Sequence, residues 1–148
     1  MEKIFSKVNP DVLLVIINRL NTVTDQRKDL TPAEEFLQVS CFKMHEGKTF
    51  RAHKHLEQKK ITTITQESFV VIKGKIKTII YDLDDTIIAE PVINAGDCVI
   101  TLYGGHNYLG LEDETIIYEH KTGPYYGIEK DKKFIDYGGE EKKWVKKH

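Results

Sequence analysis

The sequence predicts a single all-β domain, a small sandwich or barrel preceded by one helix. The chain has 148 residues, which is the length of one ordinary domain with a sizeable core. From Phe36 onward, short runs rich in β-branched residues alternate with turns that contain Gly, Asn, Asp or Pro. Residues 1–35 differ, because Asn9, Pro10 and Asp11 together form a typical helix start.

The composition limits which binding partners and which cellular compartment we expect for the protein. Twenty-two Lys and Arg nearly balance 23 Asp and Glu, so the net charge of −1 indicates neither a nucleic acid nor a membrane surface as partner. No apolar run reaches the roughly 18 residues of a membrane-spanning helix, and no signal peptide follows Met1. Cys41 and Cys98 lack the spacing of a disulfide framework. We therefore expect a cytoplasmic protein.

Three parts of one domain are expected along the chain. After Asn9-Pro10-Asp11, a wide apolar face from Val12 to Leu20 predicts a helix. We expect residues 1–35 to form a helical segment that packs on the outside of the barrel or across a dimer contact; the alternative is a helix that binds a regulatory partner. Residues 36–137 form the barrel, and residues 138–148 form a charged tail.

The strands follow from β-branched runs and the turns between them. The predicted strands are residues 36–44, the segment around His53 and His55, and residues 61–72, 75–81, 86–93, 98–103 and 115–121. Asp82-Leu83-Asp84-Asp85 is expected to be a hairpin turn. The same residues resemble the nucleophile motif of haloacid-dehalogenase-like phosphatases, but the strand-like segment after Thr86 favours the turn.

A pair of histidines and one glutamate predict a metal site. His53 and His55 are two residues apart, so on a strand both imidazoles leave the same face. Both faces of strand 61–72 are mixed, so alternation alone does not identify the buried one; we place the Phe69 face inward because Phe69 is its largest apolar group. Glu67 then also faces inward, where an ionised carboxylate requires a partner. A shared metal ion would be that partner.

A third histidine is available downstream. Gly104 and Gly105 precede His106, and a Gly-Gly pair lets the backbone approach a metal pocket closely. The candidate metal ligands are therefore His53, His55, Glu67 and His106.

These residues resemble the first motif of the cupin family. The matching parts are Gly47-x5-His53-x-His55 and Glu67-x6-Gly74. The resemblance implies a double-stranded β-helix, a jelly-roll-like barrel, with a three-His, one-Glu site for one divalent metal ion (Zn, Fe, Ni or Mn). Eleven residues separate His55 from Glu67, where the cupin pattern has three or four, so the resemblance implies a longer hairpin here.

The second cupin motif is also recognisable. Gly96 and His106 occupy the expected roles, although the stretch is one residue short. Leu102 stands at the proline position and Gly110 at the asparagine position. The metal-ligand positions are retained despite these departures.

The segment Glu119-His120-Lys121-Thr122-Gly123-Pro124-Tyr125 resembles the end of small cupins found in polysaccharide-biosynthesis gene clusters. If its strand face lines the barrel, Glu119 is a candidate acid/base and Lys121 a contact for a substrate anion; the alternative is a surface ion pair. Tyr103, Tyr108 and Tyr125 flank the second motif and either rim the pocket or pack in the core. We take Tyr125 as a second candidate catalytic residue, and Tyr103 and Tyr108 as candidate pocket residues.

The resemblance to cupins implies three function classes, of which the resemblance to polysaccharide-cluster cupins favours the first. The first is a metal-dependent isomerase or epimerase that acts on a small sugar or sugar nucleotide by proton transfer next to a carbonyl. The second is an Fe, Ni or Mn dioxygenase, and the third is a non-catalytic metal- or ligand-binding module. Fold alone does not distinguish them. We also expect a homodimer that involves residues 1–35.

Overall fold

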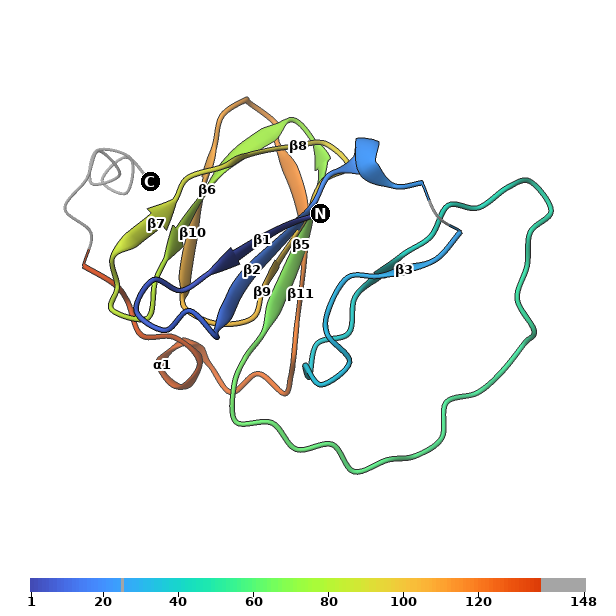
Figure 1. Cartoon of the computed structure of the whole chain (residues 1–148), viewed down its shortest axis with the longest axis horizontal. Helices are drawn as coiled ribbons and strands as arrows, with labels where there is room; N and C mark the ends of the chain where they lie inside the picture. The colour runs from blue at the N-terminus through green and yellow to red at the C-terminus, as the bar shows by residue number, and fades with distance from the viewer. Residues whose placement is uncertain (25, 137–148) are drawn as a thin grey trace.

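A computed structural model of the chain describes residues 1–24 and 26–136, which form two antiparallel sheets and a small hairpin (Figure 1). The five-stranded sheet has the order β1 (Glu2–Phe5), β2 (Leu13–Asn18), β9 (Cys98–Thr101), β5 (Glu67–Lys73) and β11 (Ile116–Lys121). The four-stranded sheet contains β10 (Gly105–Gly110), β6 (Lys75–Tyr81) and β7 (Ile87–Ala89), with β8 (Val92–Asn94) also paired to β6. The hairpin pairs β3 (Lys28–Asp29) with β4 (Ser40–Cys41). Within the described residues, helix is limited to η1 (Leu20–Thr22) and α1 (Ile128–Asp131).

The all-β prediction is confirmed. The two large sheets share one apolar core, to which β2 contributes Leu14, β5 contributes Phe69 and Val71, and β6 contributes Ile80. In the described part of the chain these strands form separate sheets rather than a closed barrel. No helix among these residues is long and apolar enough to cross a lipid bilayer. The charged tail predicted for residues 138–148 lies outside the described residues.

The N-terminal helix prediction is wrong, because Leu13–Asn18 is strand β2, paired with β1 on one side and β9 on the other. All six residues of β2 are buried. One face packs into the core between the sheets, and the other packs through Ile16 against Leu30 and the β3–β4 segment. A strand buried on both faces gives a continuous apolar run, which the sequence shares with a wide helix face. Residues 1–35 are therefore not a helical segment on the outside, and their first two strands belong to the sheet.

The predicted hairpin after β6 is confirmed. The turn is closed by a hydrogen bond from the Asp85 amide to the Asp82 carbonyl at 3.1 Å. The Asp82 carboxylate accepts hydrogen bonds from the amides of Lys7 and Leu83 at 2.7 and 2.8 Å. This carboxylate therefore joins the turn to the segment after β1.

Two glycines of the cupin-like motifs lie in turns that a larger residue would strain. Gly74, between β5 and β6, has φ +75°, and Gly96, before β9, has φ +87°. A Cβ at Gly74 would collide with Thr115, and one at Gly96 would collide with Leu20. Both positions need glycine because of the left-handed backbone and the close approach of these neighbours.

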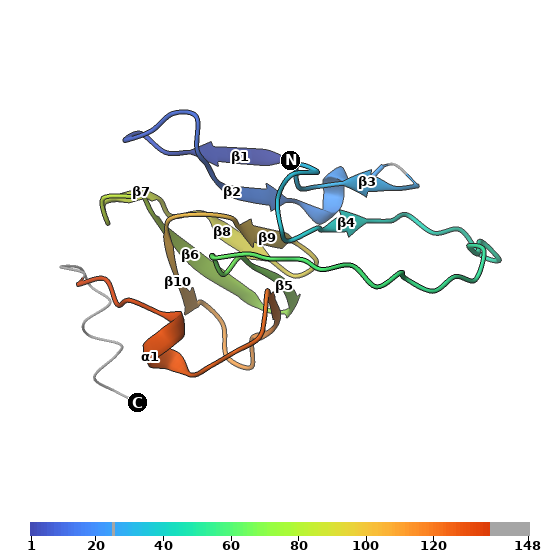
Figure 2. The ribbon, with the colours of Figure 1, turned by 90° about the horizontal axis from the view of Figure 1, so that it is seen from below.

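A long segment leaves the body of the domain. Residues 42–65, called the arm below, contain no strand or helix and extend away past β3 and β4 in both views (Figures 1 and 2). The strands predicted for residues 36–44 and 61–72 are realised only as Ser40–Cys41 and Glu67–Lys73. Loops of this length without secondary structure are uncommon in compact domains and are often functional.

A buried carboxylate ties η1 to the turn between β8 and β9. Asp97 is 5% exposed and accepts hydrogen bonds from the amides of Leu20 and Asn94 at 2.9 and 3.1 Å. Arg19 donates a third at 3.1 Å and also pairs with Glu2 at 2.7 Å. Burial acts to raise the pKa of Asp97, but these hydrogen bonds outweigh it and hold the pKa below its usual value.

We predict that Asp97→Asn lowers the free energy of unfolding by about 1–3 kcal/mol at pH 7, because charge-assisted hydrogen bonds to a buried group are lost. A carboxyl with a lowered folded-state pKa stabilises the fold above its unfolded pKa and ceases to do so as the pH falls through the folded value. The difference between wild type and variant should therefore shrink below about pH 4. Urea unfolding at several pH values measures this, with the exposed Asp113→Asn as control. A difference independent of pH would contradict the assignment.

Candidate functional site

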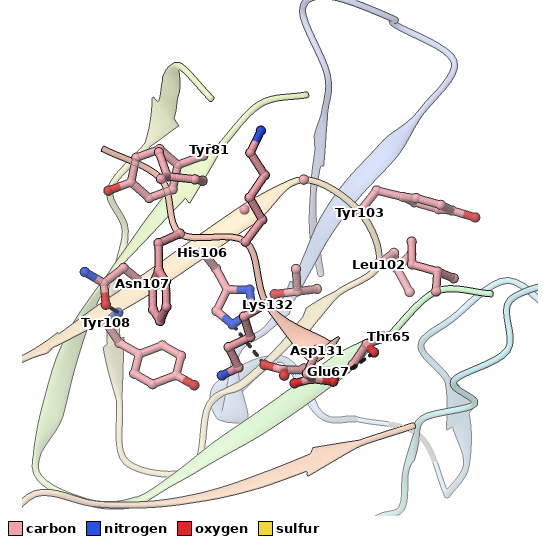
Figure 3. Close-up of a pocket in the computed structure, with 17 residues that line it drawn as sticks. Thr65, Glu67, Tyr81, Leu102, Tyr103, His106, Asn107, Tyr108, Asp131 and Lys132 are labelled. Atoms are coloured by element: carbon pink, nitrogen blue, oxygen red, sulfur yellow. Dashed lines mark hydrogen bonds and ion pairs between the residues drawn. The ribbon is translucent and has the colours of Figure 1, made fainter. Parts of the chain in front are cut away.

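A cavity of about 400 Å³ opens beside the start of β5, between the end of β9, the first half of β10 and residues 131–135 (Figure 3). Glu67 from β5 and His106 from β10 both line it. The cavity is thus formed by strands of both large sheets and by residues 131–135. Its volume lies within the range of small-molecule sites.

The position of Glu67 follows from the register of β5. Glu67, Phe69 and Val71 alternate along one face of the strand and are 5%, 1% and 0% exposed. The prediction that the Phe69 face turns inward is therefore confirmed. Phe69 and Val71 fill the core, and Glu67 lies at the end of the same face, where the core gives way to the cavity.

Glu67 and His106 form the polar centre of the cavity. Oε2 of Glu67 lies 2.9 Å from Nε2 of His106, although this oxygen receives no hydrogen bond of good geometry. The contact with His106 lowers the pKa of Glu67, against the effect of burial. Two atoms that bind one metal ion at right angles, each at roughly 2.1 Å, lie about 3 Å apart. The spacing of the pair therefore fits two ligands of one metal ion.

His53 and His55 are not at this site in the chain. Both are exposed residues of the arm, and their ring centroids are 5.3 Å apart. Nδ1 of His53 lies 2.9 Å from the carbonyl oxygen of Arg51. Across residues 1–24 and 26–136, no group of three or more His, Cys, Asp or Glu side chains is arranged to hold a metal ion. The structure thus brings together two of the four predicted ligands and leaves the other two, near each other, on the arm.

Glu119 lies on the inner face of β11, but it is exposed and does not line the cavity. It pairs with Phe69 in the register of β11 and β5, so the two side chains share the inner face of the sheet. Its carboxylate accepts a hydrogen bond from the Tyr108 hydroxyl at 2.6 Å. The Tyr108 ring stacks on His106 with centroids 5.7 Å apart. Burial, followed by the Glu119 carboxylate, raises the pKa of Tyr108.

Lys121 is also on the inner face, but carboxylates already surround its charge. Its Nζ lies 2.9 Å from Oδ2 of Asp131 and 3.9 Å from Oε1 of Glu67. The ammonium group lies 4.4 Å from the ring centroid of Tyr125. Tyr125 itself is 56% exposed and does not line the cavity. Tyr103 lines the cavity, and burial, followed by Glu35, raises its pKa.

Sequence reasoning missed the segment after α1. Asp131 accepts a hydrogen bond from Thr65 at 3.3 Å, and residues 132–135 continue the cavity wall (Figure 3). The run Glu129-Lys130-Asp131-Lys132-Lys133 is typical of a solvated surface, so it gave no sign of a pocket. Tyr81 was missed as well, because it ends a strand whose pattern indicates only core packing.

No protein-family model matches the chain, no curated protein is significantly similar to it in sequence, and no solved structure matches it. The resemblance to cupins therefore rests on the motif residues alone.

We predict that Glu67 and His106 are energetically coupled even without metal. In a double-mutant cycle with Glu67→Gln and His106→Gln, the coupling should be about 0.5–3 kcal/mol, because each single change leaves the other buried group without its partner. Urea unfolding in the presence of a chelator measures it. Glu67→Gln combined with His120→Gln is the control, since His120 pairs with Ser68 on the opposite face of the sheet. Additive effects of the Glu67 and His106 changes would contradict the contact.

Proposed function

We propose that this protein is a metal-binding cupin that isomerises or epimerises a small sugar or sugar nucleotide. The observation that carries the proposal is the 2.9 Å contact between Glu67 and His106, inside a cavity that also holds Tyr108. A carboxylate and an imidazole at this separation are a suitable pair of ligands for a divalent ion. Two facing antiparallel sheets of short strands are compatible with the cupin fold that the motifs imply.

Four residues would hold the metal ion. Glu67 and His106 supply two ligands from the rigid sheets, and His53 and His55 supply two from the arm. When bound, a divalent ion would polarise the carbonyl oxygen of the substrate.

The proton is moved by Glu119. Its carboxylate accepts a hydrogen bond from the hydroxyl of Tyr108, which lines the cavity and stacks on His106. A carboxylate fixed beside the metal ligands can take a proton from the carbon next to the carbonyl and return it on either face or to the neighbouring carbon. Tyr108 is better placed than the exposed Tyr125 to assist this step, because it contacts both Glu119 and His106.

The lining of the cavity suits a sugar that carries phosphate. Tyr103 lines the cavity and offers an aromatic face against which a sugar ring can pack. Lys132 and Lys133 line the same cavity and could pair with phosphate oxygens. The Lys121 ammonium is less available to an anion, because Asp131 and Glu67 already neutralise it.

The metal site can be tested by the metal content of the purified protein, without an activity assay. Protein purified after supplementation should carry about one divalent ion per chain, and His53→Ala or Glu67→Gln should lose most of it. His120→Ala, a change on the outer face of β11, is the matched histidine control and should keep the metal. Elemental analysis measures the metal content of the wild type and of each variant. A wild-type protein that stays free of metal and fully stable after supplementation would refute the site.

The reaction prediction is proton exchange with solvent. When a panel of keto sugars and sugar nucleotides is incubated in D₂O, deuterium should enter next to the carbonyl of the true substrate, as followed by NMR. Glu119→Gln should keep its metal and slow this exchange by a factor of about 100 or more. Metal-dependent oxygen uptake without deuterium entry would instead indicate a dioxygenase. Tight ligand binding with neither deuterium entry nor oxygen uptake would indicate a binding module.

A further inference from the structure

The arm is a loop with both ends fixed and with His53 and His55 near its middle. It starts after Cys41, which pairs with Lys28, and ends before Gln66, whose side chain accepts a hydrogen bond from the Leu37 amide at 2.8 Å. About ten residues separate His53 from the first end of the arm and His55 from the second. Ten extended residues span at most roughly 35 Å, so the length of the arm allows the His pair to lie far from both fixed ends.

The arm exposes apolar side chains that a monomer leaves in water. Phe50, Leu56 and Ile61 are 55%, 84% and 74% exposed. Phe42 and Phe50 contact each other, with ring centroids 5.6 Å apart. A group of large apolar residues on one extended segment is typical of a surface that another polypeptide covers.

Charge identifies what kind of surface the arm fits. Residues 42–65 contain six Lys or Arg and two Asp or Glu, a net charge of +4. Residues 1–41 and 66–136 contain 12 Lys or Arg and 19 Asp or Glu, a net charge of −7. The arm is therefore electrostatically complementary to the body of the same kind of chain.

The predicted metal ligands are also divided between the body and the arm, two on each. The body of one chain holds Glu67 and His106 at an open cavity. The arm, whose residues include His53 and His55, extends away from the body of the domain (Figure 1). A second copy presents the same cavity and the same arm. An exchange of arms between two copies would cover the apolar residues, pair the opposite charges and complete two metal sites.

We propose that two copies of this chain exchange arms, so that His53 and His55 of one copy join Glu67 and His106 of the other. Exchange of an identical element between protomers is a low-cost route to a symmetric dimer. The inference rests on the proposed metal site and adds that the site is completed only by a partner. It also places the dimer contact on the arm instead of on residues 1–35.

Complementation between two inactive variants tests the exchange. One variant carries His53→Ala and His55→Ala, and the other carries Glu67→Gln and His106→Ala. Each alone should bind no metal. Co-expressed with different affinity tags and purified through both, the heterodimer should hold about one ion per dimer, because the intact arm of the second variant meets the intact cavity of the first. If each arm served its own chain, this heterodimer would hold none.

In the matched control, exchanged arms predict no bound metal, and arms that serve their own chain predict about one ion per dimer. A chain with all four substitutions, paired with a wild-type chain, has no intact arm opposite an intact cavity. It should therefore bind no metal when arms are exchanged, and about one ion per dimer when each arm serves its own chain. Circular dichroism checks that every variant is folded.

Assembly gives a second measurement that does not depend on the metal ligands. Leu56→Asp combined with Ile61→Asp should convert the dimer into a folded monomer, as measured by light scattering, and should lower its metal content at least tenfold. A wild-type monomer that binds metal would overturn the exchange and leave the proposed function intact. A wild-type dimer that binds no metal would refute the proposed function, and with it the exchange.

Discussion

The register of β5 is the constraint on which both the core and the site depend. The strand lies between β9 and β11, and its inner face carries Glu67, Phe69 and Val71. Because side chains alternate with a period of two residues, burying Phe69 in the core also places Glu67 on the inner face. The pairing with β11 brings Glu119 opposite Phe69 and Lys121 opposite Glu67. A shift of one residue would turn the inner-face side chains of β5 to the other face of the sheet together.

The contact between Glu67 and His106 links the two sheets at the edge of their common core. Glu67 belongs to the five-stranded sheet, and His106 pairs with Ile80 inside the four-stranded sheet. A buried carboxylate is costly unless it is paired, so the two sheets have one preferred separation at this point. Tyr108 extends the link, since its ring stacks on His106 and its hydroxyl donates a hydrogen bond to Glu119. The polar groups of the site thus also hold the sheets together.

The sequence predicted the parts of this arrangement that local chemistry determines. The inward face of Glu67 followed from the size of Phe69, and the turn at Asp82 followed from its residue types. Strand β2 was mistaken for a helix, because a strand covered on both faces loses the alternation that identifies strands. The path of residues 42–65 could not be predicted either. Their composition allows a hairpin, and only tertiary contacts that the body does not offer would select one.

A site divided between rigid strands and an unsupported arm would couple metal affinity to assembly. Glu67 and His106 are already in place, so binding a metal ion would not need to reorganise them. Ordering the arm, in contrast, costs conformational entropy for each of its residues. Metal binding and burial of Leu56 and Ile61 would have to offset that cost together. Under the proposed exchange, metal and partner would therefore each strengthen the binding of the other.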